Sequence, residues 1–537
     1  MKAFVILLLM GLTCVSAQSA SSTHAALGTS AASDSSGRLW IAYAEQQGEG
    51  ANVLLRRSDD EGATWQQPVR VTAKPEPVAA DGENRPKIAF GPGTEIYVSW
   101  TSPTSAAFTG DIRFARSLDA GKHWSAPQVL HRDRQVITHR FESMLVDGAG
   151  RIWVAWIDKR DLKQAEAEKR DYAGAAIYYA YSDDRGASWR GDFKLADHTC
   201  ECCRIALAKD ANGRAAALWR HVFPPNERDH AYAVLDPRSS APSIARVTFD
   251  RWRIDACPHH GPSLAYASDG TRHAVWFNQV DGQGRAFYGR FGESGPDNVQ
   301  PLPAGASHAD LAVYGNTIAV VWKRFDGAAT KVESWLSTDG GRRFSAGPTL
   351  QTSSDSDQPR VLNVKDKILL AWRRADGVVV RSLTDTSKRA TPLSQRHADT
   401  ARAAPTAAIG PFGRDTLASI ERRYSGQPFW LVLWDLECVY CMKSLRNLAE
   451  AQRAHPGLKV VTITTDSISA AKQIDARLAQ LGVASEPYAF SDAPREALQF
   501  AVDPTWLGEK PRAYRYAADG KRQAVSGVIT AEQFAER

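Results

Sequence analysis

The stretch Ser182-Asp-Asp-Arg-Gly-Ala-Ser-Trp189 is one of four copies of the pattern Ser-x-Asp-x-Gly-x-x-aromatic in this chain. The other copies are residues 58–65, 117–124 and 337–344. Each copy predicts a tight hairpin, because the Asp carboxylate can accept backbone N–H groups of its own turn and Gly tolerates positive φ. The ring of the final aromatic residue is expected to pack beneath that turn. The aspartates of the pattern are therefore expected to stabilise the fold and to have no catalytic role.

A second repeated feature is a short segment of alternating apolar and β-branched residues that ends in an aromatic residue. Such a pattern is typical of strands. The segments recur at a spacing of roughly 50 residues, which is the period of propeller blades with long loops. Their final residues are Tyr43, Trp100, Trp156, Trp219, Trp276, Trp322 and Trp372.

The hairpins and strands together resemble the Asp boxes and blades of sialidase-type (BNR) β-propellers over residues 25–395. In that family the Asp boxes join the outer strands of a blade and are structural. The resemblance implies an all-β propeller. The number of aromatic-ended strands favours seven blades, and six blades are the alternative. Because a propeller closes its sheets radially, the strand-end tryptophans are expected in the core.

The first residues have the features of a cleaved signal peptide, predicted to span residues 1–17. Lys2 supplies the positive charge, an apolar run follows from residue 4 to 15, and small residues end the leader at Ala17. A lipidated Cys14 is disfavoured by the residue before it, and no later apolar run is long enough to span a membrane. The sequence predicts a periplasmic or secreted protein, in a compartment where disulfides are the default.

The charge balance excludes one broad class of partner. The 537-residue chain has a net charge of +6, a mild excess over a large surface. No basic run interleaved with aromatic residues occurs, so no nucleic-acid partner is expected.

The propeller repeats stop after residue 395, where the composition changes. Residues 396–409 are rich in Ala and Pro and predict a linker. Over residues 410–537 the pattern becomes strand, helix, strand, helix, which implies a parallel βαβ unit in a small α/β domain. The chain is therefore expected to be multidomain, with an α/β domain after the propeller.

The pair Cys438-Val-Tyr-Cys441 lies where a buried strand of this domain meets a helix. Unpaired N–H groups and the dipole at a helix N-terminus favour thiolate, and the second Cys is near enough to close a disulfide. Strand, motif and helix resemble thioredoxin-fold proteins over about residues 410–537, particularly exported TlpA/ResA-like thiol–disulfide oxidoreductases. The resemblance implies that Cys438 attacks and Cys441 resolves, and it matches Pro511 to the cis-proline of that fold.

Two residues depart from the pattern of that family. Glu437 stands where Trp is usual, and Tyr440 replaces the more usual Pro or His. A carboxylate beside Cys438 is expected to raise the pKa of the thiol and to weaken its oxidising tendency. Reduction, isomerisation and oxidation therefore all stay open. A permanent disulfide and a zinc half-site are the inert alternatives.

Four more cysteines are concentrated in the stretches His198-Thr-Cys-Glu-Cys-Cys203 and Cys257-Pro-His-His260. Cys203, His260 and Arg140 have the same register relative to the strand-ending Trp of their repeats. In a propeller this register corresponds to the loop that leads into the innermost strand, so both stretches are expected at one mouth of the central channel. The candidate ligands there are Cys200, Cys202, Cys203, Cys257, His259 and His260.

Three interpretations of this cluster compete. Thiolates with imidazoles suit Cu(I) or Zn(II), and copper is the better match for clustered thiols in an exported protein. Alternatively, the thiols form two structural disulfides, although the adjacent Cys202 and Cys203 could pair only under strain. In the third interpretation the thiols exchange electrons with Cys438 and Cys441. The first and third combine, because metal binding needs reduced thiols and a fused dithiol acts at high effective concentration.

The sequence therefore predicts an exported thiol–disulfide oxidoreductase whose propeller holds a copper or redox site that the C-terminal dithiol keeps reduced. Periplasmic thiol or disulfide proteins, an electron donor and a metal-handling protein are the expected partners. The alternative is a protein- or glycan-binding propeller with structural disulfides. A sialidase-type glycosidase is less favoured. Arg85, Arg140 and Arg360 are expected at the mouth, but the Arg-Ile-Pro signature is absent and no Tyr/Glu pair can be placed.

Overall fold

The computed structural model describes residues 27–48, 50–236, 238, 242–292, 295–385 and 409–536. The expected leader and residues 396–408 of the expected linker lie outside the described residues. No helix in the described part of the chain is long and apolar enough to cross a membrane.

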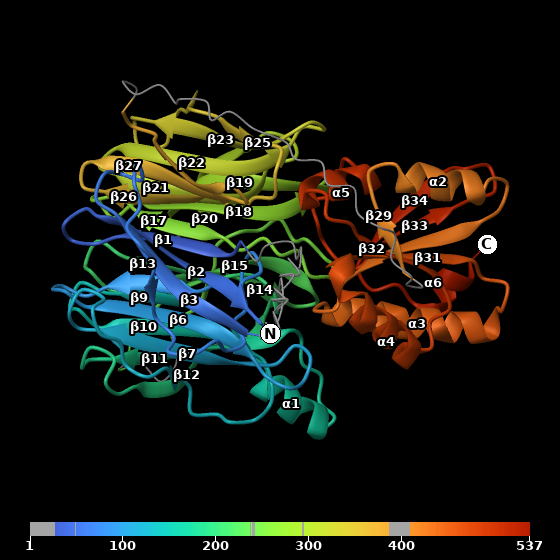
Figure 1. Ribbon diagram of the computed structural model, residues 1–537, viewed down its shortest axis with the longest axis horizontal. Coiled ribbons are helices and arrows are strands. Elements are labelled where there is room, and N and C mark those ends of the chain that lie inside the picture. Colours follow the sequence, from blue (N-terminus) through green and yellow to red (C-terminus); the bar gives the residue numbers. More distant parts are fainter. Residues whose placement is uncertain are drawn as a thin grey trace, which may run out of the picture.

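The described strands between residues 29 and 382 form seven antiparallel blades (Figure 1). The first blade contains β1 (Thr29–Ser33), β2 (Leu39–Gln47), β3 (Gly50–Ser58) and β4 (Val69–Arg70). The second contains β5 (Lys87–Phe90), β6 (Ile96–Pro103), β7 (Gly110–Ser117) and β8 (Gln128–Val129). The third contains β9 (His139–Val146), β10 (Ile152–Asp158), β11 (Ala175–Ser182) and β12 (Arg190–Thr199), with helix α1 (Arg160–Ala167) between β10 and β11.

The fourth blade contains β13 (Ala206–Lys209), β14 (Ala215–Phe223), β15 (Glu227–Val234) and β16 (Ala245–Arg246). The fifth contains β17 (Ser263–Tyr266), β18 (Arg272–Val280), β19 (Gln283–Gly292) and β20 (Gly295–Pro301). The sixth contains β21 (Ser307–Tyr314), β22 (Thr317–Phe325), β23 (Thr330–Ser337), β24 (Ser345–Ala346) and β25 (Leu350–Thr352). The seventh contains β26 (Arg360–Val364), β27 (Lys367–Arg374) and β28 (Gly377–Ser382).

The first strands of the blades form a closed ring at the centre of the propeller. In chain order β1, β5, β9, β13, β17, β21 and β26 each contact the next, and β26 contacts β1. This closed ring makes the fold a β-propeller. The aromatic-ended segments are the second strands of the blades, and their six tryptophans are at most 3% exposed, as expected for core residues.

The Ser-x-Asp-x-Gly turns lie at the ends of the third strands, far along each blade from the ring. In the turn after β11, Gly186 N–H donates to Ser182 Oγ at 2.8 Å and Ser188 N–H donates to Asp184 Oδ1 at 2.9 Å. Slight burial opposes ionisation of Asp184, but these hydrogen bonds outweigh it and lower the pKa to about 2. The ring of Trp189 packs edge-on against Phe114 of the neighbouring blade. The aspartate thus holds the turn, as the pattern predicts.

The C-terminal α/β domain is built on a mixed sheet with the strand order β29-β32-β31-β30-β33-β34. Its strands are β29 (Gly410–Phe412), β30 (Phe429–Trp434), β31 (Val460–Ser467), β32 (Glu486–Phe490), β33 (Arg512–Tyr516) and β34 (Arg522–Ser526). Its helices are α2 (Thr416–Arg423), α3 (Val439–Ala454), α4 (Ala471–Leu481), α5 (Arg495–Val502) and α6 (Ala531–Ala535), with a 3₁₀ turn at Ile468–Ala470. β30 pairs parallel with β31 and β31 with β32, so the expected βαβ unit is present.

The α/β domain lies against one end of the propeller (Figure 1). Glu496 of α5 forms an ion pair with Lys323 of β22, and Phe500 packs edge-on against Phe325. The contact face of the propeller is the end where the loops lead into its inner strands, since Cys257, just before β17, pairs with Lys510 through its backbone.

Candidate functional site

Three of the predicted ligands, Cys200, Cys202 and Cys203, lie in the loop that leads from β12 to the inner strand β13. Cys200 Sγ lies 3.8 Å from Cys202 Sγ and 3.4 Å from Cys203 Sγ. All three are free thiols and are at most 4% exposed. The sulfur atoms therefore form a buried group of a kind that can hold a soft metal ion.

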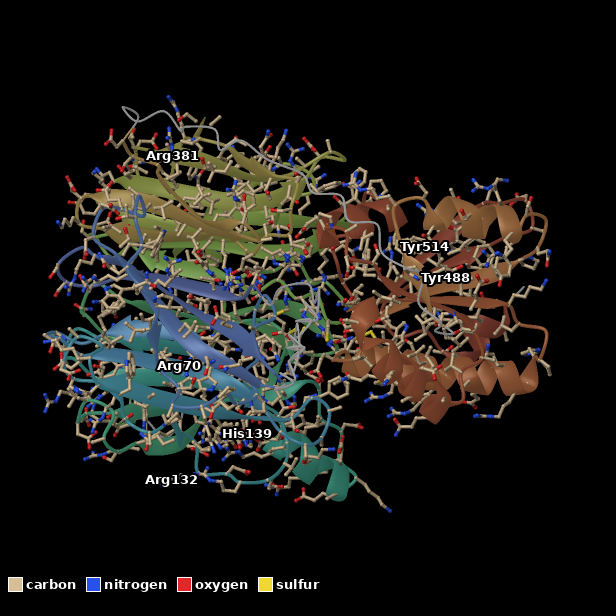
Figure 2. All side chains as sticks on the ribbon, in the orientation of Figure 1. Arg70, Arg132, His139, Arg381, Tyr488 and Tyr514 are labelled. Atoms are coloured by element: carbon tan, nitrogen blue, oxygen red, sulfur yellow. A yellow bond between two sulfur atoms is a disulfide. The ribbon has the colours of Figure 1, made fainter. Side chains whose placement is uncertain are left out.

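Cys257 and His259 come from the corresponding loop before β17. Their ligand atoms and Cys202 Sγ lie within 4.8 Å of one another. Cys257 is also a free thiol. Because Cys202 belongs to both groups, the five residues from two neighbouring blades form one continuous cluster, which we call the sulfur cluster. Figure 2 shows sulfur atoms in yellow near the junction of the two domains.

The predicted role of His260 as a ligand needs correction. Its Nε2–H donates to the Leu507 carbonyl at 2.9 Å, and its Nδ1 accepts from His308 N–H at 3.4 Å. The ring stacks between Phe277 and His308. Since both ring nitrogens have other partners, His260 lies outside the sulfur cluster and helps to attach the α/β domain instead.

Glu83 connects the two cysteine loops through hydrogen bonds to both of them. Its carboxylate accepts from Arg204 Nη1 at 2.9 Å and from Gly261 N–H at 3.2 Å. Arg204 in turn donates to the carbonyls of Pro262 and Ala309. Hydrogen bonds and opposite charges from Arg204 and His308 outweigh burial and lower the pKa of Glu83. This buried, ionised pair fixes both loops at the mouth of the channel.

Arg228 of β15 brings a positive charge to the sulfur cluster. Its Nη1 lies 3.8 Å from Cys200 Sγ. Hydrogen bonds from the Cys202 and Cys203 thiols, and then the charge of Arg228, hold the pKa of Cys200 well below its usual value. Burial raises the pKa of both Cys202 and Cys203. Cys200 is therefore the thiol of these three that ionises most readily.

His259 is arranged as a ligand in a way that His260 is not. Its Nε2 is buried and makes no hydrogen bond. Burial, and then the charge of Lys510, lowers the pKa of His259 to about 4, so the imidazole is neutral at pH 7. A buried nitrogen without a partner is costly unless something binds it. Beside Cys202 and Cys257, the partner that fits is a soft cation.

The C-terminal pair is a disulfide between Cys438 and Cys441 at the start of α3. Cys438 caps this helix, and its Sγ accepts from Cys441 N–H at 3.1 Å. Both side chains are fully buried and belong to the hydrophobic core of the α/β domain. The Lys510–Pro511 peptide bond is cis, as predicted. The ammonium of Lys510 forms an ion pair with Asp435, at the end of the strand that precedes the disulfide.

A cavity of about 30 Å³ lies between the sulfur cluster and the residues on either side of Cys438. Cys202, Cys257 and His259 line it from the propeller, and Glu437 and Val439, on either side of Cys438, line it from the α/β domain. A cavity of this size holds a water molecule or an ion, whereas ligand pockets for small molecules are roughly ten times larger.

Residues between and beside the two cysteines contact the propeller directly. Tyr440 Oη accepts from Arg228 Nη2 at 3.1 Å and lies 3.4 Å from Glu201 Oε1. Glu437 forms an ion pair with Arg140. The Glu437 carboxylate was expected to raise the pKa of Cys438. Its charge is compensated by an arginine of the other domain.

Sequence reasoning missed the residues that join the two halves of the site, namely Arg228, Glu201 and Lys510. Nothing in the strand pattern distinguishes them, because their role depends on the docking of one domain on the other. A third group of possible ligands, formed by Asp111, His131 and His139, was also not predicted as a site. It lies between the second and third blades, where His139 is labelled in Figure 2.

Two of the arginines expected for a sialidase-type site, Arg85 and Arg360, contact other residues of the propeller. Arg85 is fully buried and donates to the Thr29 carbonyl and to Asp357 and Gln358. Arg360 lies 3.4 Å from Asp310. Neither these contacts nor the small cavity provides a carboxylate-binding pocket for a sugar acid in the described structure.

Residues 37–236 match the family model of a BNR repeat-like domain. Among solved structures it is similar to an ulvan lyase of polysaccharide lyase family PL25, with 12% identity and a TM-score of 0.44 over 67% of this chain and 95% of that one. It is also similar to the NanB sialidase from Streptococcus pneumoniae, with 12% identity and a TM-score of 0.37 over 62% of this chain and 69% of that one.

A third similar structure is the α-L-arabinofuranosidase Arb93A from Fusarium graminearum. The identity is 14% and the TM-score 0.39, over 60% of this chain and 92% of that one. No curated protein matches the chain.

Proposed function

We propose that this protein is an exported thiol–disulfide oxidoreductase in which the C-terminal dithiol keeps the sulfur cluster of the propeller reduced for binding a soft metal ion. Copper is the metal that we favour, and zinc is the alternative. The observation that carries this proposal is the shared cavity, which Cys202, Cys257 and His259 line together with the neighbours of Cys438.

The donor set supports the metal. Cys202, Cys257 and His259 would hold the ion through two sulfurs and one neutral imidazole nitrogen, a combination that suits Cu(I) or Zn(II). The metal would supply a soft Lewis acid that keeps the thiols deprotonated. Arg228 favours the thiolate of the neighbouring Cys200, and burial excludes water.

The α/β domain supports the redox half of the proposal. A CxxC pair at the start of a helix, after a central parallel strand, is the arrangement expected of a thioredoxin-like domain. We propose that its dithiol donates electrons to oxidised propeller cysteines and is reduced again by an external protein dithiol. Because metal binding needs reduced thiols, this exchange would set how much of the cluster can bind metal.

The test is metal content and free-thiol count of the purified mature protein, measured for wild type and for Cys438→Ser. After reduction and anaerobic loading with Cu(I), we expect bound copper with four free propeller thiols accessible after denaturation. After exposure to a mild disulfide oxidant and an external dithiol reductant, wild type should recover its propeller thiols and Cys438→Ser should not.

Two results would contradict the proposal separately. Absence of bound copper and zinc in the fully reduced protein would overturn the metal site. Equal recovery of propeller thiols in wild type and in Cys438→Ser would overturn the role of the C-terminal dithiol.

A second candidate function rests on the match of residues 37–236 to a BNR repeat-like domain. In this proposal the propeller is a protein- or glycan-binding module, and the cysteines are not needed for it. Binding to a glycan array that is unchanged in a Cys200→Ser, Cys202→Ser, Cys203→Ser variant would favour this function. Hydrolysis of a fluorogenic sialoside would identify the less favoured glycosidase.

A further inference from the structure

One segment of the propeller binds the α/β domain through backbone hydrogen bonds, with an isolated antiparallel bridge between Cys257 and Lys510. Cys257 N–H donates to the Lys510 carbonyl at 2.7 Å, and Lys510 N–H donates to the Cys257 carbonyl at 3.2 Å. Two residues earlier, the Asp255 carbonyl accepts from Val528 N–H at 3.0 Å. Backbone hydrogen bonds of this kind set the register of a strand without regard to its side chains. Here the register places Cys257 itself opposite Lys510.

Lys510 lies beside the disulfide and not at a distant edge. Its ammonium pairs with Asp435, three residues before Cys438, and donates to Thr465 Oγ1 at 3.1 Å. The residues on either side of Cys438 line the cavity into which Cys257 and Cys202 also face. The paired segment therefore delivers one particular propeller sulfur to the side of the disulfide.

The other propeller thiols are placed differently. Cys200 and Cys203 group with Cys202, and neither is among the residues that line the cavity. Cys202 is the sulfur shared by both groups. Cys202 and Cys257 are therefore the two propeller cysteines that both line the cavity beside Cys438, and their sulfurs lie within 4.8 Å of each other.

We propose that Cys257 is the propeller sulfur that exchanges with Cys438, and that Cys202–Cys257 is the propeller disulfide that the α/β domain reduces. This assignment rests on the proposed function and names the sulfurs through which it acts. The hydrogen-bonded segment around Cys257 holds that sulfur in register for attack.

The exchange balances with two electrons. The Cys438 thiolate attacks Cys257 Sγ, forming a Cys438–Cys257 bond and breaking the Cys202–Cys257 bond, and Cys202 leaves as a thiolate that takes up a proton. The Cys441 thiolate then attacks Cys438 Sγ and releases the Cys257 thiolate. The α/β domain ends oxidised and the propeller reduced, which are the states in this structure. An external protein dithiol returns two electrons to the Cys438–Cys441 disulfide.

The test traps the intermediate. In the full-length Cys441→Ser variant, the second step is blocked. After reduction, the variant is treated with a mild disulfide oxidant such as diamide, quenched with an alkylating agent, digested and mapped by mass spectrometry. We expect an intramolecular disulfide that joins the peptide of Cys438 to the peptide of Cys257, and we expect it to disappear in Cys441→Ser, Cys257→Ser.

The outcomes separate this inference from the proposed function. A disulfide from Cys438 to Cys200, Cys202 or Cys203 would overturn the assignment of Cys257 and leave intramolecular exchange intact. No disulfide between the domains would overturn both. A second measurement uses the wild-type protein and so does not depend on the folding of the variants. Limited oxidation of the reduced protein should form Cys202–Cys257 as the propeller disulfide. Any other pairing would contradict the proposal.

Discussion

At the residue scale, the two adjacent histidines show how differently identical side chains are used. His259 has a buried, unpartnered Nε2 beside two thiols, whereas both nitrogens of His260 are hydrogen-bonded at the domain junction. The thiols also differ from one another. Hydrogen bonds from neighbouring thiols and the charge of Arg228 lower the pKa of Cys200, whereas burial raises the pKa of Cys202.

His259→Ala is expected to lower copper affinity by at least about tenfold, because one ligand of the cluster is lost. The pKa of His259 is about 4, so protonation of this imidazole should not weaken metal binding between about pH 6 and pH 8. Competition with a chromogenic Cu(I) chelator measures the affinity. His198→Ala is the matched control, since the ring of His198 contacts Ala173 and is outside the cluster. Equal affinities in both variants would exclude His259 as a ligand.

Arg228→Met is expected to raise the pKa of Cys200, because it removes the positive charge 3.8 Å from the sulfur. The pKa of Cys200 is lowered in the folded protein, so its ionisation contributes stability that is complete above the unfolded pKa of about 9 and is lost as the pH falls through the lowered value. The ultraviolet absorbance of the thiolate, followed against pH in the metal-free reduced protein, reports the shift.

Arg214→Met is the control for this titration, since Arg214 is an exposed residue of the same blade that pairs with Asp210. It should leave the thiolate titration unchanged. A titration that is identical in Arg228→Met and wild type would show that the sulfur neighbours alone set the acidity of Cys200.

At the element scale, four of the seven blades have a turn whose aspartate binds backbone N–H groups, and helix α3 begins at a cysteine that caps it. These are local devices, in which a side chain satisfies the backbone of its own turn. They were predictable from spacing for this reason. The strand β30 was likewise predicted at residues 429–434, because a continuous apolar run between turns is typical of a central parallel strand.

Asp184→Ala is expected to destabilise the propeller by about 1 kcal/mol, similar to the loss of a helix N-cap, where a side chain also holds backbone N–H groups. The change in the free energy of unfolding is measured by urea denaturation. Asp183→Ala is the neighbouring control, because the exposed pair of Asp183 with Arg151 contributes little. If Asp183→Ala destabilises the protein as much as Asp184→Ala, the turn does not depend on its aspartate.

At the scale of the whole molecule, docking of the α/β domain brings the segment that carries the disulfide to the propeller. Cys438 and Cys441 are fully buried, and Glu437 and Tyr440 beside them contact the propeller. We therefore expect an external reductant to reach the disulfide faster when the two domains separate. We expect the C-terminal cysteines to react with the propeller cysteines when the domains are docked and with an external reductant when the domains separate. The contacts at the interface would then determine how often each of these states occurs.

Glu496→Lys is expected to speed reduction of Cys438–Cys441 by a water-soluble phosphine at least tenfold. The substitution places like charges at the Glu496–Lys323 contact, which costs several kcal/mol, and 1.4 kcal/mol corresponds to a factor of ten. Rates are measured by quenched alkylation and mass spectrometry. Glu450→Lys, on the exposed face of α3, makes the same charge change away from the interface and should react as wild type does. Equal rates in both variants would show that docking does not protect the disulfide.

The amino-acid sequence alone was enough to predict the propeller, the α/β unit, the CxxC pair and the placement of two cysteine loops at one mouth. Each of these follows from local periodicity or from the register of a repeat, which the chain carries within a few dozen residues. It did not determine that His259 and not His260 faces the thiols, because adjacent residues of a loop can point either way.

The three-dimensional structure was needed to show that Cys257 lies opposite Lys510, that Arg140 compensates Glu437, and that Tyr440 contacts Arg228. These contacts join residues of different domains. They depend on how two separately folded surfaces fit, and no periodicity along the chain encodes that fit. The copies of Ser-x-Asp-x-Gly-x-x-aromatic build the ring of blades, and the docked α/β domain makes one mouth of that ring a candidate site of thiol chemistry.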